Sequence, residues 1–351
     1  MGKELTTQQM AAKELIRCDL RYLFTILQKK DSINSNYIVS MMPYQSLIID
    51  GVEAWVAAMN NANPGTIDAP GFTQKEKQFY DAARQSIKLW EMSYEEVYTL
   101  LETYYAESDD YFSSLCKPIA KHLRLYDIFG ADLTEDGHFC GNTILDSVYL
   151  PGYNLGDSEY GPNLRDMAVI GGKYIPTFDA MDAYEVNPNL RFQYRNYGGF
   201  VKSPVGNKFS YRFVLFSILS QLNFILYAVD QYIVPEIPTK LRFAYILYYY
   251  LCDMLPKINA KHGTSFSLNQ SFYSQEFRNA MAHYKIGVYL KVHEIVQEDP
   301  MYGMTQKAFG CDFYQVKNGI MSEMKKLAVQ LECQYLFLQS FQDNAAETEC
   351  N

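Results

Sequence analysis

Apolar residues recur every three to four positions over the first third of the chain, from Thr6 to about Gly130. This spacing is typical of helices that bury one face. A break falls at residues 61–65, where Asn, Pro and Gly interrupt the pattern. The pattern predicts a helical N-terminal domain, residues 1–130, with helices near residues 6–29, 36–60, 73–90, 93–106 and 110–128.

The periodic pattern is lost between Ala131 and Lys208, where Gly, Pro, Asn and Asp are frequent. The β-prone pieces in this part are short: Tyr149, Val169-Ile170 and Phe192-Gln193-Tyr194. Such a composition is typical of loops with little regular structure. We therefore predict that residues 131–208 are a loop-rich insertion or linker that can include a short β-hairpin.

Helical spacing returns after residue 208, in stretches near residues 209–234, 239–258, 274–296 and 316–342. Pro235 and Pro238 separate the first two, because proline fits poorly inside a helix. Four consecutive helices with short links are typical of a bundle. The fold class predicted for the whole chain is all-α, with a C-terminal helical bundle at residues 209–345.

The most apolar window, Phe213 to Val234, is about as long as a membrane span. It contains polar side chains that are costly in lipid, at Gln221, Asn223, Asp230 and Gln231. It is therefore interpreted as a buried helix. The seven cysteines are scattered without a CxxC pair, and the N-terminus lacks the apolar stretch of a signal peptide. We expect reduced thiols, no membrane association and a cytoplasmic location.

Charge is unevenly distributed along the chain. The net charge is −9, which argues against a protein that coats nucleic acid with its whole surface. Residues 91–190 hold eighteen acidic and five basic residues, whereas residues 191–291 hold twelve basic and four acidic ones. Two interpretations stay open: the two segments attract each other, or the basic segment has a face that binds a polyanion.

The sequence Phe277-Arg278-Asn279-Ala280-Met281-Ala282-His283-Tyr284 lies in the third predicted helix of the bundle. At about 100° per residue, one stripe holds the apolar residues, which are Phe277, Met281, Tyr284, Val288, Val292 and Ile295. Asn279 and His283 lie one turn apart on the opposite side, and Arg278 lies on the shoulder. These positions on a helical wheel predict a core stripe and, on the opposite side, an Asn279–His283 pair within reach of Arg278.

Ile286 and Leu290 share the face of His283. Because an apolar face needs cover, we expect something outside the bundle to bury it, most simply a second copy of the chain.

The order Arg-Asn-x-x-Ala-His resembles the Arg-(four to six residues)-His signature of the HEPN superfamily, whose members are compact helical bundles and often metal-independent ribonucleases. The resemblance covers residues from about 205 to 345. It implies Arg278, Asn279 and His283 as catalytic residues, RNA as substrate, and a site shared by two copies of a homodimer. It also implies a bacterial toxin or anti-phage effector, with an antitoxin or sensor as a further partner.

The chemistry of these residue types agrees with that resemblance. Histidine suits proton transfer near neutral pH, and arginine offers a permanently charged fork of donors to a phosphate. The 2′-hydroxyl of RNA would then attack the neighbouring phosphorus without a metal ion or another cofactor. Asn279 would orient the imidazole or the phosphate.

Other interpretations were weighed. A non-catalytic HEPN module for dimerisation or nucleotide binding is the alternative function, and an unrelated all-α regulator is a further one. His293 and Glu294 match the start of the HExxH zinc-protease motif, but Gln297 stands where the second histidine is required. A calcium-loop pattern begins at Asp132, but Thr143 stands where a glutamate is required. The sequence therefore predicts no metal site.

Overall fold

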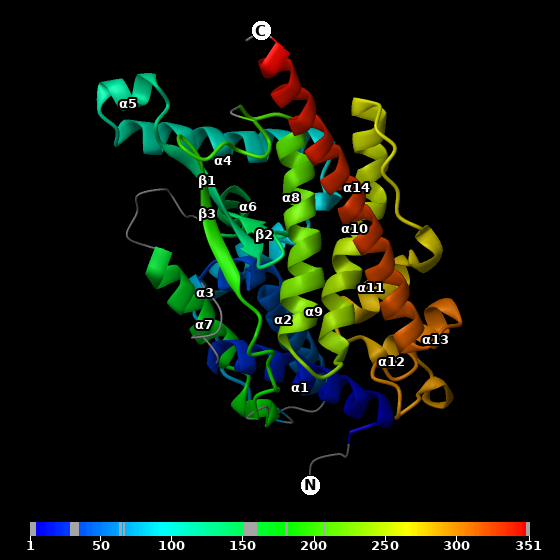
Figure 1. Ribbon diagram of the computed structural model, residues 1–351. Helices are drawn as coiled ribbons and strands as arrows, with labels where there is room; N and C mark the ends of the chain where they lie inside the picture. The colour runs from blue at the N-terminus through cyan, green and yellow to red at the C-terminus, as the bar shows by residue number, and fades with distance from the viewer. Residues whose placement is uncertain are drawn as a thin grey trace.

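The computed structural model describes residues 5–28, 35–62, 65, 67–150, 160–179, 182–206 and 208–348 of the 351-residue chain. Helices make up most of this structure, and a sheet of three strands lies among them (Figure 1). A mainly helical fold class is thereby confirmed. The β component is a three-stranded sheet, larger than a single hairpin.

The N-terminal region is helical, as its periodicity predicts. Its elements are α1 (Thr7–Gln28), α2 (Ser35–Ala62), α3 (Gln74–Ser86), η1 (Leu89–Glu91), α4 (Tyr94–Ser114) and α5 (Pro118–His122). Capping boxes begin two of the helices, Thr73 with Glu76 at α3 and Ser93 with Glu96 at α4. The prediction of separate helices near residues 93–106 and 110–128 is wrong, because α4 runs through the predicted break and only the short α5 follows it. The helical region also ends before residue 130, since the first strand begins at Asp127.

The middle part contains more regular structure than its composition predicts. Its elements are β1 (Asp127–Thr134), β2 (Phe139–Asn142), α6 (Thr143–Tyr149), α7 (Tyr160–Gly172), η2 (Pro176–Phe178) and β3 (Phe192–Gly198). The strand order is β2-β1-β3, with both pairs antiparallel. Phe192-Gln193-Tyr194 does lie in a strand, but Tyr149 ends α6, and Val169 and Ile170 lie in α7. α6 has seven residues, too few for a clear period, and α7 contains Gly161, Pro162, Gly171 and Gly172, which are typical of loops.

The C-terminal part is helical. Its elements are α8 (Tyr211–Asn223), η3 (Phe224–Val229, a π-helical turn), α9 (Asp230–Tyr232), α10 (Pro238–His262), η4 (Gln270–Phe272), α11 (Gln275–Ala282), α12 (Ile286–Tyr289), η5 (Val292–Glu294), α13 (Met304–Phe309) and α14 (Phe313–Thr348). In Figure 1, α8 stands between the sheet and the pair α10 and α14.

The apolar window is the core helix that the sequence predicts. Tyr211–Tyr232 is long and apolar enough to cross a membrane by length and composition alone, but 89% of its most apolar window is buried inside the protein. Phe213 and Phe216 pack against Phe129 of β1, with ring centroids 5.1 and 5.9 Å apart from it. Burial against the sheet thus accounts for the hydrophobicity of this helix.

One hydrophobic core cluster includes buried residues from all three parts of the chain. Tyr22 of α1 meets Phe243 of α10 at 5.6 Å, and Tyr105 of α4 meets Phe213 of α8 at 5.3 Å between ring centroids. The N-terminal helices therefore pack directly on the C-terminal ones. The division into domains at residues 130 and 208, and the HEPN type of the bundle, stay predictions.

Candidate functional site

Helix α11 ends directly before His283. The backbone N–H of Lys285 donates to the carbonyl oxygen of Ala280 at 3.0 Å, and Tyr284 has a φ of 49°. This arrangement is a Schellman-type helix end, in which tyrosine takes the left-handed position usually held by glycine. The prediction of one continuous helix over residues 274–296 is therefore wrong: α12 and η5 follow as separate short elements.

A buried polar network explains why the helix ends there. The Tyr284 hydroxyl donates to Asp19 Oδ2 at 2.5 Å, and Arg242 Nη1 donates to the Tyr284 hydroxyl at 2.8 Å. Arg242 also forms an ion pair with Asp19, and both are almost fully buried. Breaking a buried ion pair is strongly destabilising. The network therefore holds the turn at residues 283–285 against α1 and α10.

Gly51 brings α2 close to the same turn. A Cβ atom on Gly51 would lie 2.7 Å from Cε2 of Tyr284 and 3.0 Å from the carbonyl oxygen of Ala282. Both distances are too short for packed atoms, so the two segments can touch only because residue 51 has no side chain. The preceding residue, Asp50, is thereby brought beside His283.

The change of direction at Tyr284 alters which residues are buried. Ile286 and Leu290 are 0% and 2% exposed within their own chain, whereas Val288 and Val292 are 87% and 61% exposed. The predicted core stripe is thus wrong beyond Tyr284. The expectation that a second copy of the chain buries Ile286 and Leu290 is also wrong, because both side chains are already buried within one chain.

His283 lies partly exposed beside a carboxylate. Its side chain is 28% exposed, and Nδ1 lies 3.5 Å from Oδ2 of Asp50. This is an ion-pair distance, somewhat longer than an ideal hydrogen bond. The side chain lines a cavity of about 530 Å³ together with Trp55 and Met59 of α2. Within the described part of the chain, Nε2 of His283 has no hydrogen-bond partner.

Asp50 is held in its charged form. The pKa of its carboxyl is lowered, first by the interaction with His283 and further by Arg84, while partial burial opposes the shift. Arg84 Nε lies 3.6 Å from Oδ2 of Asp50. The result is a carboxylate shared by His283, which follows α11, and Arg84 of α3.

Arg278 and Asn279 contact each other rather than His283. Arg278 Nη1 donates to Oδ1 of Asn279 at 2.9 Å, and Nη2 lies 3.7 Å from Oε1 of Glu91. The guanidinium lies over the rings of Tyr249 and Tyr250, at 5.1 and 5.5 Å from their centroids. The side chain is 14% exposed. The structure therefore places Arg278 beside Asn279, and among the described residues no side-chain hydrogen bond joins Asn279 to His283.

Asn279 lines a second cavity, of about 410 Å³, on the other side of α12. Lys285 and Val288 line both this cavity and the one beside His283. Lys285 is exposed, and among the described side chains no ion-pair partner for it is found. It is thus a cation between the two cavities.

Asp50, Lys285 and the Tyr284 network are absent from the sequence prediction. Asp50 is more than two hundred residues from His283, and no pattern connects them. Gly51 is the one available signal, since a glycine in the middle of a helix often marks a close approach.

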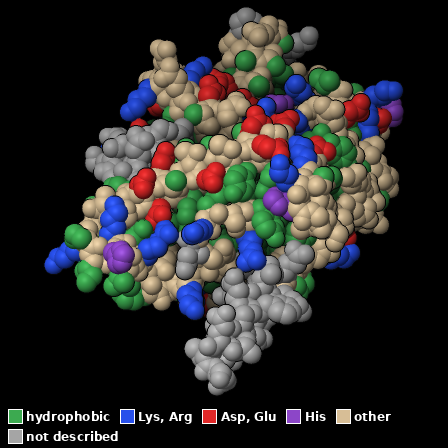
Figure 2. All heavy atoms as spheres, turned by 90° about the horizontal axis from the view of Figure 1, so that it is seen from above, with side chains coloured by type: hydrophobic (Ala, Val, Ile, Leu, Met, Phe, Trp, Pro, Cys, Tyr) green, Lys and Arg blue, Asp and Glu red, His purple; other side chains and the backbone are tan. Residues whose placement is uncertain are grey.

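Charge and metal-ligand clusters add no further site. On the face in Figure 2, acidic and basic side chains both occur among apolar and uncharged ones, and neither sign covers that face. Among the described residues, no group of three or more His, Cys, Asp or Glu side chains is placed to hold a metal ion.

Comparison with family models, with curated proteins and with solved structures finds no match to this chain. The resemblance to HEPN proteins therefore rests on the residues between Phe277 and Tyr284.

Proposed function

We propose that this protein is a metal-independent endoribonuclease in which His283 transfers protons during cleavage of RNA. The observation that carries the proposal is the place of the imidazole, at the wall of a cavity with Nδ1 beside Asp50. A carboxylate on one ring nitrogen holds the ring in one orientation and leaves the other nitrogen for a bound molecule. The likeness of Arg278, Asn279 and His283 to the HEPN signature supports RNA as that molecule.

Cleavage begins when Nε2 of His283 accepts the proton of a ribose 2′-hydroxyl. The 2′-oxygen forms a bond to phosphorus, and the bond from phosphorus to the 5′-oxygen of the next nucleotide breaks. The 5′-oxygen takes up a proton from water while the His283 imidazolium releases its own to the solvent, so the products are a 2′,3′-cyclic phosphate and a 5′-hydroxyl. Proton transfer by a positioned side chain contributes about 10²–10⁴ to such a rate. DNA has no 2′-hydroxyl and is not cleaved.

The phosphate needs cations, because negative charge builds up on it in the transition state. In this proposal Arg278 turns toward the phosphate by giving up its 3.7 Å contact with Glu91. Asn279 stays bonded to Arg278 and orients it. Lys285 is a second cation, exposed at the cavity that His283 lines.

The partners of the proposed nuclease follow from the same resemblance. A homodimer would place two sets of Arg278 and His283 in one cleft, and exposed Val288 and Val292 lie near that surface. The further partner is a sensor or an antitoxin, as expected of a cytoplasmic toxin or anti-phage effector.

The test is cleavage of a labelled single-stranded RNA by the purified protein in EDTA, with DNA of the same sequence alongside. We expect RNA fragments that end in a cyclic phosphate, intact DNA, and a rate at least about 10²-fold lower for His283→Ala. His293→Ala is the matched control. His293 is exposed on η5, so this variant should cleave RNA at the wild-type rate. Full activity of His283→Ala would contradict the role given to His283.

A non-catalytic module is the second candidate function. The observation in its favour is that Arg278 is mostly buried, with contacts to Asn279, Glu91 and two tyrosine rings of its own chain. A phosphate would have to compete with those contacts. No RNA cleavage by any form, together with binding of a nucleotide that His283→Ala weakens, would favour this function over the nuclease.

A further inference from the structure

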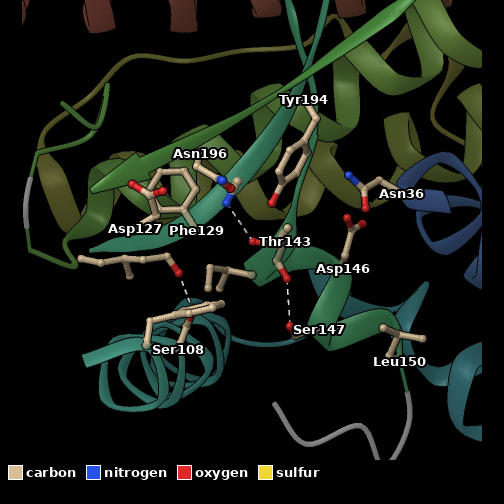
Figure 3. Close-up of a pocket in the computed structure, with 14 residues that line it drawn as sticks. Asn36, Ser108, Asp127, Phe129, Thr143, Asp146, Ser147, Leu150, Tyr194 and Asn196 are labelled. Atoms are coloured by element: carbon tan, nitrogen blue, oxygen red, sulfur yellow. Dashed lines mark hydrogen bonds between the residues drawn. The ribbon is translucent and has the colours of Figure 1, made fainter. Parts of the chain in front are cut away.

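A third cavity, of about 430 Å³, is lined by residues other than those around His283. It is bounded by β1, β3, α4 and α6, with Asn36 at the start of α2 (Figure 3). None of its lining residues lines the cavity beside His283. The cavity is thus separate from the proposed nuclease site.

The cavity is lined by apolar side chains and by two acidic ones. Apolar surface comes from Phe112, Ile128, Phe129, Ile144 and Leu150. The charged side chains that line it are Asp127 and Asp146, and no Lys, Arg or His is among the lining residues. Among the described residues that line the cavity, these two carboxyl groups therefore have no cation beside them.

Asp146 is the more unusual of the two. It is 5% exposed, its Oδ1 accepts a hydrogen bond from Ser40 at 2.8 Å, and it takes part in no ion pair with a described residue. Figure 3 shows its carboxyl group pointing into the cavity, toward Asn36 and Tyr194. Burial and the nearby Asp132 raise the pKa of this carboxyl. Burial therefore favours the neutral acid, and an ammonium group bound beside it would favour the charged carboxylate.

Tyr194 of the sheet forms part of the cavity wall. Tyr194 of β3 lies across β1 at Gly130, where a Cβ atom would collide with the tyrosine hydroxyl. The Tyr194 hydroxyl reaches the interior of the cavity beside Thr143 (Figure 3). Burial and the charges of Asp132, Asp146 and Asp127 raise its pKa to about 12, so it stays a neutral hydroxyl. An aromatic ring and a hydroxyl beside carboxylates suit an ammonium group.

We propose that this cavity binds a small organic amine, with the ammonium group against Asp146 and an apolar body between Ile128, Ile144 and Leu150. Asp127 and the Asn36 amide oxygen supply further acceptors at the cavity wall. The proposal does not depend on the nuclease function, because it shares no residue with that site.

The test is isothermal titration calorimetry with 2-phenylethylamine and, as the neutral match, 2-phenylethanol at the same ionic strength. We expect saturable binding of the amine and binding of the alcohol at least about tenfold weaker, since hydrogen bonds to charged groups contribute about 1.5–3 kcal/mol. Asp146→Asn should weaken the amine at least about tenfold and leave the alcohol unchanged. Asp110→Asn, an exposed carboxylate on α4 outside the cavity, is the matched control.

Equal affinity for the amine and the alcohol, or no binding of either, would overturn the proposal. Unchanged amine binding by Asp146→Asn would overturn it as well. If Asp146→Asn does not fold, Asp127→Asn replaces it, because that side chain is only partly buried and lines the same cavity. Circular dichroism of each variant identifies a loss of fold.

Discussion

At the scale of single residues, the candidate site depends on which groups meet His283. The helical wheel predicts an Asn279–His283 pair, but the helix ends before His283 and Asn279 bonds to Arg278 instead. The group that lies beside the imidazole is Asp50, on a helix of the N-terminal region. A contact across more than two hundred residues is tertiary, and spacing along one sequence does not reveal it.

Asp50→Asn tests whether this carboxylate positions His283. The amide can turn to offer the imidazole a donor in place of an acceptor, which favours the wrong tautomer. We expect kcat for RNA cleavage to fall about 10²-fold while KM changes little, because substrate binding does not use Asp50. An unchanged kcat would show that Asp50 has a structural role only.

The difference in stability between the wild type and Asp50→Asn should depend on pH, which a general loss of fold would not produce. The pKa of Asp50 is lowered in the folded protein, so its stabilising contribution is present above the unfolded pKa of about 3.9 and is lost as pH falls below it. In urea titrations the wild type should therefore be more stable than Asp50→Asn at pH 7, and the difference should shrink as the pH falls below about 4.

At the scale of elements, the turn after α11 is where the sequence-based prediction fails. Apolar spacing continues through residue 295, and no glycine or proline marks an end at Ala282. The end comes from burial of the Tyr284 hydroxyl between Asp19 and Arg242, residues of two other helices. Local pattern predicts helices well where one face meets the core, and it misses ends that a distant polar network imposes.

Gly51→Ala tests the close approach of α2 to this turn. Alanine favours a helix by about 1 kcal/mol over glycine. Its Cβ would nevertheless lie 2.7 Å from the Tyr284 ring and 3.0 Å from a backbone carbonyl oxygen, and such overpacking costs about 1–3 kcal/mol. We expect a net loss of stability in urea unfolding and, because the His283 turn shifts, slower RNA cleavage.

Gly172→Ala is the control for that substitution. Gly172 is the last residue of α7, and a Cβ atom there would meet nothing within 4 Å. Its stability should stay the same or rise by up to about 1 kcal/mol. Equal gains for both variants would contradict the close contact between α2 and Tyr284.

At the scale of the whole molecule, periodicity predicts the helical class and most helices outside residues 131–208. It also identifies Tyr211–Tyr232 correctly as a core helix, which packs through Phe213 and Phe216 on the sheet. It does not predict α6, which is too short to show a period, nor α7, which has Gly and Pro residues near its ends. Nor does it predict that α1, α2 and α10 meet around the His283 turn, which depends on tertiary packing.

The proposed nuclease depends on proton transfer by the His283 imidazole during RNA cleavage. The most direct measurement is the cleavage rate of His283→Ala in EDTA with and without added free imidazole, which can occupy the space left at the cavity wall beside Asp50. We expect His283→Ala to lose RNA cleavage and to regain it as the imidazole concentration rises. The cleavage rate of His293→Ala should not change with imidazole. Cleavage by His283→Ala at the wild-type rate without imidazole would contradict it.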